Sequence, residues 1–209
     1  MKAVVQPLQQ ARFRIMEVDV SHTDLGESQL LGPSAQLPQQ CLPVDVVKTL
    51  PHRSILETRL LRWPDEAACE ATARALAAQP LLRDAFIELH GPLGAGKTTL
   101  VRHLLRALGV QGRIKSPTYA VLEPYELADG LAISHFDFYR FEDAAEWSDA
   151  GFRDVFAQPG LKLAEWPEKV AAALPPPDLR LELEPQEDDQ RTVTFQALTP
   201  RGLALLQAL

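Results

Sequence analysis

The pattern of apolar and polar positions changes near residue 56. Before that point Gln and Pro are frequent, as in GPSAQLPQQCLP (32–43), and the apolar residues follow neither a helical nor a strand period. A segment of this composition buries too little apolar surface to offset the entropy of ordering it. We therefore expect residues 1–55 to be a disordered N-terminal extension and residues 56–209 to form the folded domain.

From residue 57 onward the pattern predicts strands that alternate with helices. Alternating or short apolar runs predict strands at 57–63, 86–89, 119–126, 131–138, 161–166, 178–185 and 192–198. Helical spacing predicts helices that run from Asp65 as N-cap to Pro80, from Lys97 to Gly109, through part of 142–158 with an interruption at Gly151, and over 200–209.

Turn sequences indicate how some of these strands pair. Ala128–Gly130 separates two predicted strands and has the chemistry of a tight turn, which favours an antiparallel hairpin. The strands at 178–185 and 192–198 flank the acidic turn QEDDQ and predict a second antiparallel hairpin, at the edge of the sheet.

Composition narrows the class of protein. The net charge of −7 over 209 residues argues against binding nucleic acid through bulk electrostatics. Cys41 and Cys69 form no C-x-x-C pair, so we expect free thiols in a reducing compartment rather than a metal knuckle. No apolar run reaches the length of a membrane span, and the first 15 residues lack the apolar core of a signal peptide. These features predict a cytoplasmic protein with no membrane contact.

The stretch from Phe86 to Gly109 carries the clearest chemistry. Within it, Gly91, Gly96, Lys97 and Thr98 fill the spacing G-x-x-x-x-G-K-T of a P-loop, between a predicted strand and a predicted helix. Such a loop turns its N–H groups toward a phosphate, with the lysine on the β- and γ-phosphates and the threonine hydroxyl on Mg²⁺. The predicted nucleotide-binding loop residues are Gly91, Gly94, Ala95, Gly96, Lys97, Thr98 and Thr99.

Two strand-end carboxylates are candidates to complete a magnesium site. Asp137 ends the apolar run LAISHF and Glu165 ends LKLA. Either can hold the ion, directly or through water, while the other orients the attacking water. Thr118, in the stiff segment Ser116–Tyr119, offers a hydroxyl that can sense the γ-phosphate as a switch residue does. The pattern leaves the division of labour between the two acids open.

Other P-loop classes lack their usual residues here. No N-K-x-D follows the predicted hairpin, which argues against guanine recognition of the small-GTPase kind, and no arginine-rich lid supports a nucleotide kinase. Two alternatives nevertheless stay open: a small-molecule or nucleoside kinase with Asp137 as the base, and a nucleotide-gated adaptor that does not hydrolyse ATP. The first needs an acceptor pocket and a lid, for which the sequence gives no sign.

Five stretches together resemble the TsaE family, also called YjeE, the bacterial ATPases needed to make threonylcarbamoyladenosine in tRNA. They are PDEAA (64–68), GPLGAGKTTLVR (91–102), KSPTYAVLEPYE (115–126), HFDFYR (135–140) and LAEWPEK (163–169). Many proteins share the P-loop, whereas S-P-T-Y, H-F-D-x-Y-R and E-W-P are specific to this family. The resemblance covers about residues 57–209, and the first 55 residues depart from it.

The resemblance implies a compact α/β fold of the P-loop NTPase type, a three-layer α/β/α sandwich with a mixed β-sheet, that binds ATP and Mg²⁺ and hydrolyses ATP weakly alone. It also implies partnership with the TsaD–TsaB heterodimer, in which TsaD performs the transfer, so that tRNA is contacted only through the complex. The modified tRNAs would be those that read codons beginning with adenine. Family roles carry over to Lys97 (phosphates), Thr98 and Glu165 (Mg²⁺), Thr118 (switch), Asp137 (Mg²⁺ or water), Trp166 (site wall), Arg191 (near the nucleotide) and Glu66 (beside adenine).

Overall fold

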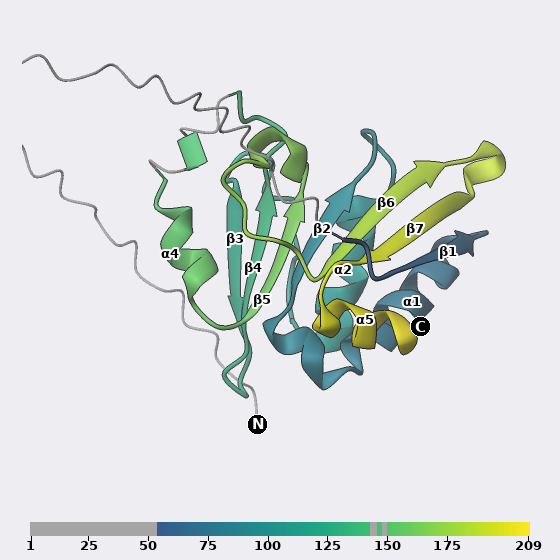
Figure 1. Cartoon of the computed structure of the whole chain (residues 1–209), viewed down its shortest axis with the longest axis horizontal. Helices are drawn as coiled ribbons and strands as arrows, with labels where there is room; N and C mark the ends of the chain where they lie inside the picture. Colours follow the sequence, from purple (N-terminus) through teal and green to yellow (C-terminus); the bar gives the residue numbers. More distant parts are fainter. Residues whose placement is uncertain (1–53, 143–145, 148–149) are drawn as a thin grey trace, which may run out of the picture. The chain divides into compact units, whose positions relative to one another are not determined.

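The described part of the chain forms one mixed seven-stranded sheet (Figure 1). The computed structural model describes residues 54–142, 146–147 and 150–209, so the predicted extension lies almost entirely outside the described residues. The strands are β1 Glu57–Trp63, β2 Phe86–His90, β3 Leu122–Glu126, β4 Ala132–Asp137, β5 Leu161–Glu165, β6 Leu179–Pro185 and β7 Arg191–Ala197. Their order is β1-β7-β6-β2-β5-β4-β3. Strand β2 runs parallel to β5 and β6, β4 runs parallel to β5, and the remaining pairs are antiparallel.

Helices cover both faces of this sheet, which confirms the predicted α/β class (Figure 1). The α-helices are α1 Glu66–Ala77, α2 Lys97–Leu108, α4 Phe152–Ala157 and α5 Pro200–Gln207, and the 3₁₀ helices are η1 Pro80–Asp84, η2 Pro167–Val170 and η3 Glu187–Asp189. Residues of α1, α2 and α5 share one apolar core with the sheet. Helix α4 packs on the opposite face, where Phe152 meets Phe136 at a ring separation of 5.3 Å.

Local sequence signals set the helix ends that were predicted. Asp65 caps α1, because its carboxylate accepts a hydrogen bond of 2.9 Å from the Ala68 N–H. Helix α2 begins at Lys97 and is capped after Leu108 by Gly109, whose φ of 104° lies in the left-handed region that favours glycine. Both signals act within one helical turn, so the sequence alone is enough to find them.

Two predicted elements differ from the structure, and a third is described only in part. The hairpin of β6 and β7 forms, but it lies inside the sheet because β1 pairs with the outer side of β7. Residues 119–121 are not part of β3. They belong to a turn closed by the Val121 N–H and the Pro117 carbonyl at 2.6 Å, which leaves Tyr119 exposed. The predicted helix at 142–158 is described only in part, and its described portion after Gly151 is α4.

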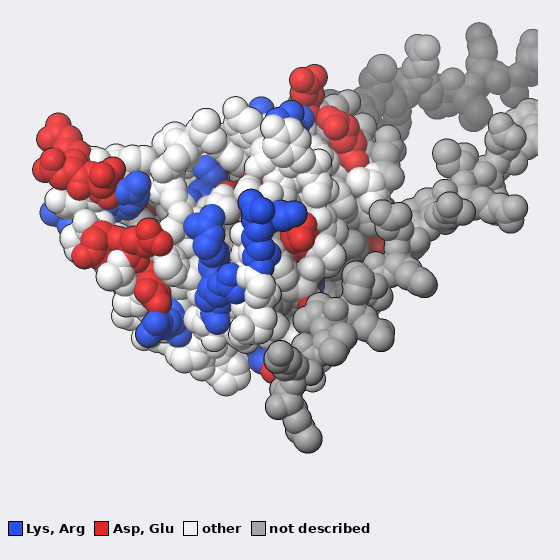
Figure 2. All heavy atoms as spheres, turned by 180° about the vertical axis from the view of Figure 1, so that it is seen from behind, with Lys and Arg blue, Asp and Glu red and all other residues white. Residues whose placement is uncertain are grey.

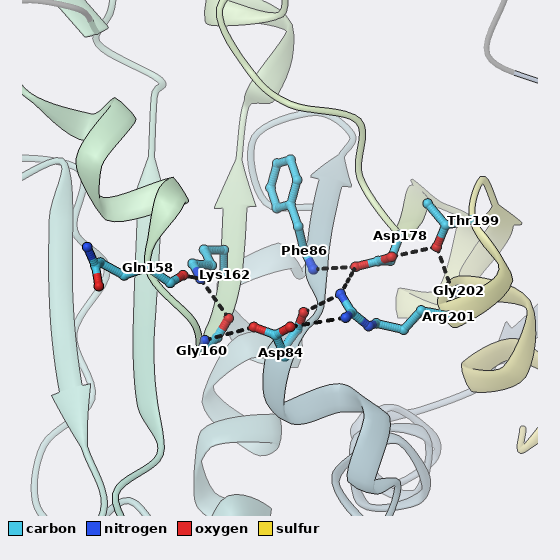
Figure 3. Close-up of polar contacts among 9 residues, drawn as sticks. All are labelled: Asp84, Phe86, Gln158, Gly160, Lys162, Asp178, Thr199, Arg201 and Gly202. Atoms are coloured by element: carbon cyan, nitrogen blue, oxygen red, sulfur yellow. Dashed lines mark hydrogen bonds and ion pairs between the residues drawn. The ribbon is translucent and has the colours of Figure 1, made fainter.

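A polar network joins the start of β2 to three other segments, as Figure 3 shows. Asp178, just before β6, accepts hydrogen bonds from the Phe86 N–H (2.9 Å) and the Thr199 hydroxyl (2.5 Å). Arg201 of α5 contacts Asp178 and also pairs with Asp84 at 3.0 Å. These contacts lie at the end of β2 opposite the P-loop, and they hold the start of this strand in place.

Charged side chains of both signs occupy the face seen in Figure 2. Lys and Arg gather in its middle, whereas Asp and Glu gather mainly toward one side. Among the residues described, no helix combines the length and apolar character needed to span a bilayer.

Candidate functional site

The P-loop sits where β2 passes into α2. Gly91, Gly94 and Gly96 have φ values of 129°, 80° and 104°, so the loop depends on conformations that other residues adopt only with strain. Gly91 also lies against β6: a Cβ there would stand 2.3 Å from the Leu183 carbonyl oxygen. The first glycine therefore has a packing role in addition to its backbone role.

Lys97 is folded back onto the loop that carries it. Its side chain is buried, and its Nζ donates to the Gly91 carbonyl at 2.5 Å and to the Pro92 carbonyl at 2.9 Å. The ammonium also lies 4.0 Å from the centre of a Trp166 ring. Burial lowers the pKa of Lys97 from its ordinary value, and the negative charge of Glu165 acts in the opposite direction. The position fits a cation kept inside the site by neutral acceptors that a phosphate can replace.

The two strand-end acids lie side by side, as the parallel strands predict. Asp137 and Glu165 are register partners at the carboxyl ends of β4 and β5, and both are buried. The Thr98 hydroxyl, at the start of α2, lies 2.9 Å from each oxygen of Glu165. The structure thus brings together three of the predicted metal-site side chains, which come from three separate elements.

The segment before β3 reaches one of these acids, Asp137. The Thr118 hydroxyl donates to Asp137 Oδ2 at 2.5 Å, and Ser116 contacts the same oxygen at 3.2 Å. The two hydroxyls are 2.8 Å apart. The turn at 117–121 explains this geometry because it points Thr118 inward and leaves Tyr119 outside, where the Arg140 guanidinium lies 4.2 Å over its ring.

Two cavities flank the P-loop and share part of it as a wall. Gly94, Ala95, Gly96 and Thr99 line both. The first cavity, of about 240 Å³, contains the acidic side of the site, and its other lining residues are Leu93, Lys97, Thr98, Ser116, Thr118, Asp137, Tyr139, Glu165 and Trp166. The second, of about 400 Å³, is lined otherwise by Trp63, Pro64, Asp65, Glu66, Cys69, Asp189 and Arg191. A phosphate-binding loop between two cavities matches a ligand that has a further group beside its phosphates.

Arg191 and Glu66 are therefore both placed beside the loop. Arg191 is the first residue of β7, and a Cβ added to Gly96 would lie 3.8 Å from its Nε atom. Cys69 is a buried free thiol in the same cavity, and burial raises its pKa to about 12. A thiol with that pKa is protonated at neutral pH, so Cys69 serves as an apolar wall rather than as a nucleophile. The other cysteine, Cys41, lies outside the described residues.

The donor set on the acidic side fits Mg²⁺. That ion prefers oxygen ligands and takes one or two carboxylates beside phosphates and waters. Thr98, Asp137 and Glu165 offer a hydroxyl and two carboxylates on one small cavity next to a phosphate-binding loop. These three side chains are the candidates to hold the ion.

Two histidines near the site were not singled out from the sequence. His135 lies within the H-F-D-x-Y-R stretch, and its Nε2 is 2.8 Å from Glu165 Oε1. His90 ends β2 and contacts Glu88 and Glu168. Because side chains alternate along β4, His135 and Asp137 lie on the same face of the sheet. This alternation is the one sequence signal that could have pointed to His135.

Comparisons with known proteins agree with this geometry. Residues 63–193 match the family model described as "Threonylcarbamoyl adenosine biosynthesis protein TsaE". The Haemophilus influenzae tRNA threonylcarbamoyladenosine biosynthesis protein TsaE is 42% identical over 123 residues, which are 59% of this chain and 77% of that protein. The Bacillus subtilis protein of the same name is 34% identical over 154 residues, or 71% of this chain and 93% of that one.

A solved structure extends the likeness to the fold. The crystal structure of Bacillus subtilis YdiB superposes with a TM-score of 0.60 at 28% identity, and the match covers 72% of this chain and 93% of that one. The family match spans the P-loop, the Thr118 turn and both strand-end acids. The chain belongs to the TsaE family.

Proposed function

We propose that this chain is the Mg²⁺-dependent, ATP-binding and ATP-hydrolysing subunit that acts with a TsaD–TsaB heterodimer to form threonylcarbamoyladenosine in tRNA. The observation that carries the proposal is the contact of the Thr98 hydroxyl, 2.9 Å from both oxygens of Glu165, at the start of the P-loop helix. It joins a phosphate-binding loop to a carboxylate that can serve a metal ion.

The two cavities support one orientation of the nucleotide. In this orientation the β- and γ-phosphates would lie on the side of Lys97 and the acids, and the base would lie on the side of Trp63, Glu66 and Arg191. When the nucleotide binds, Lys97 exchanges its hydrogen bonds to the Gly91 and Pro92 carbonyls for hydrogen bonds to phosphate oxygens. The ring of Trp166 limits the positions that the Lys97 ammonium can take.

Each residue on the acidic side then has one task. Bound Mg²⁺ supplies charge compensation on the phosphate oxygens. Thr98 and Glu165 would hold that ion, whereas Asp137 would orient the attacking water. Thr118 now donates to Asp137 Oδ2, and when it turns to the γ-phosphate it frees that oxygen for the water. In this way the switch segment couples the presence of ATP to the state of Asp137.

Charge favours tRNA contact through the complex. The net charge is −7, and acidic groups lie beside the basic ones on the face of Figure 2. A protein with this charge gains little from the release of counterions when it meets RNA. The partner complex would then supply most of the tRNA-binding surface.

The test is ATP turnover by the full-length chain with and without TsaD–TsaB. We expect weak turnover alone, stimulation by the partners, and loss of the stimulated rate in Lys97→Ala, because the lysine compensates charge on the transferred group. Arg74→Ala is the matched control, since it removes a cation from the exposed surface of α1. Absence of stimulation, or full stimulated turnover by Lys97→Ala, would contradict the proposal.

A second variant separates hydrolysis from gating. Glu165→Gln keeps the shape of the side chain and removes its charge, so we expect it to bind TsaD–TsaB but to lose turnover and multi-round tRNA modification. Multi-round modification that persists in this variant would favour the non-hydrolysing adaptor instead. ADP release that depends on an added acceptor molecule would favour the kinase.

A further inference from the structure

His135 is a fully buried histidine behind the acidic side of the site. It lies in the middle of β4, two residues before Asp137, and pairs in register with Leu163 of β5. Side chains two residues apart on a strand lie on the same face, so His135 shares a face with Asp137. On β5, Glu165 follows Leu163 by two residues and lies on the same face, so the His135 ring points toward it. The histidine is therefore placed to act on the site from inside the sheet.

The contacts of the ring select one protonation state. Nε2 lies 2.8 Å from Glu165 Oε1, whereas Nδ1 is buried and has no hydrogen-bond partner among the described residues. With the proton on Nδ1, the Nε2 lone pair would face a carboxylate oxygen, and a buried N–H would be left unpaired. With both nitrogens protonated, Nδ1–H would be unpaired as well. The neutral ring with its proton on Nε2 donates to Glu165 and leaves a lone pair, rather than an N–H, unpaired at Nδ1.

This state fixes Glu165 without neutralising it. The carboxylate is held from behind by the His135 N–H and approached from the front by the Thr98 hydroxyl at 2.9 Å. A Lys or Arg in the place of the histidine would cancel the charge that a metal ion needs. A neutral N–H donor orients the oxygens and leaves their full negative charge in the cavity.

We propose that His135 is a positioning residue, whose neutral Nε2–H donor orients the Glu165 carboxylate and thereby sets the affinity of the nucleotide-bound site for Mg²⁺. The inference rests on the proposed function, because it takes Glu165 as a group that holds the ion. It gives the histidine of the H-F-D-x-Y-R stretch a task distinct from that of Asp137. His135 itself contacts neither nucleotide nor metal.

Three variants test the position of the donor. In His135→Gln the side-chain amide N–H₂ can reach the place of Nε2, in His135→Asn it can reach only the place of Nδ1, and His135→Leu has no donor. The measurement is ADP affinity by calorimetry in EDTA and at increasing Mg²⁺, which gives the apparent affinity for the ion. Thermal unfolding of each variant shows that it is folded, and the Gln and Asn pair keeps the test valid if the Leu variant does not fold.

We expect His135→Asn and His135→Leu to weaken the apparent Mg²⁺ affinity by roughly 10- to 100-fold, with ADP affinity in EDTA little changed. His135→Gln should recover most of the loss. Unchanged Mg²⁺ affinity in His135→Leu, or equal losses in the Gln and Asn variants, would overturn the role of His135 but leave the proposed function standing. If the ADP affinity of the wild-type chain does not change with Mg²⁺ concentration, both this role and the proposed function are overturned.

A second readout needs neither nucleotide nor metal. Nitrogen NMR spectra of the chain labelled with ¹⁵N at histidine separate a protonated ring nitrogen from a bare one. We expect one buried histidine in the neutral state with its proton on Nε2, and its signals should vanish in His135→Gln. A ring with the proton on Nδ1, or a doubly protonated ring at neutral pH, would overturn the inference.

Discussion

His90 links the strand that feeds the P-loop to the segment that carries Trp166, and it should make stability depend on pH. Its Nε2 lies 3.2 Å from Glu88 Oε2 and its Nδ1 lies 3.2 Å from Glu168 Oε2. Arg180 contacts the same Glu88 at 3.0 Å. Burial disfavours the charged ring, but the hydrogen bonds to Glu168 and Glu88 prevail and raise the pKa of His90 from 6.5 to about 9.

The size of the effect follows from this shift. At about 1.4 kcal/mol per pKa unit, the shift corresponds to at most about 3–4 kcal/mol. Glu168 is 45% exposed, so solvent screens one of the two pairs and we expect roughly 1–2 kcal/mol. Because the folded pKa is raised, the contribution is complete below pH 6.5 and is lost as the pH rises through about 9.

Urea unfolding of wild type and His90→Gln at several pH values between about 6 and 9.5 measures this contribution. The wild-type advantage in free energy of unfolding should be largest at the acidic end and shrink toward the alkaline end. His103→Gln removes a histidine from α2 and controls for loss of a histidine elsewhere. Stability curves of wild type and His90→Gln that stay parallel over the whole range would refute the reasoning.

Three further predictions address the fold and the switch. Asp178→Ala leaves the buried Phe86 N–H without its acceptor and should cost about 1–3 kcal/mol in urea unfolding; a smaller loss contradicts the role of the network in Figure 3. Gly91→Ala should lower the thermal midpoint far more than Gly94→Ala, because the first Cβ meets a β6 carbonyl oxygen at 2.3 Å and the second meets nothing within 4 Å. Thr118→Val should reduce partner-stimulated ATP turnover roughly 10-fold or more with ADP affinity retained; an equal loss in ADP affinity, measured by calorimetry, contradicts a switch role.

The features that were predictable from the sequence depend on residues close together in the chain. The P-loop spacing, the Asp65 cap and the Gly109 end of α2 each lie within a few residues, and all three are present. The meeting of Asp137 and Glu165 was also predictable, because parallel strands bring their carboxyl ends to one edge.

The features that were not predictable depend on contacts between distant segments. Strand β1 pairs with β7, which brings Glu57 opposite Ala197. The alternation of residues 57–63 predicts a strand but does not indicate which strand it pairs with. Periodicity continued the strand back to Tyr119, yet the contact of Thr118 with Asp137 favours a turn there. His135 reads as an ordinary strand residue until β5 places Glu165 beside its ring.

The central claim is that ATP bound at this P-loop drives repeated rounds of tRNA modification by a partner complex. The most direct measurement counts the threonylcarbamoyladenosine formed per TsaD–TsaB heterodimer when the full-length chain, ATP and Mg²⁺ are added. We predict many products per heterodimer with the wild-type chain and with Arg74→Ala, and no more than about one with Lys97→Ala or without ATP. Equal yields with wild type and Lys97→Ala would contradict the account.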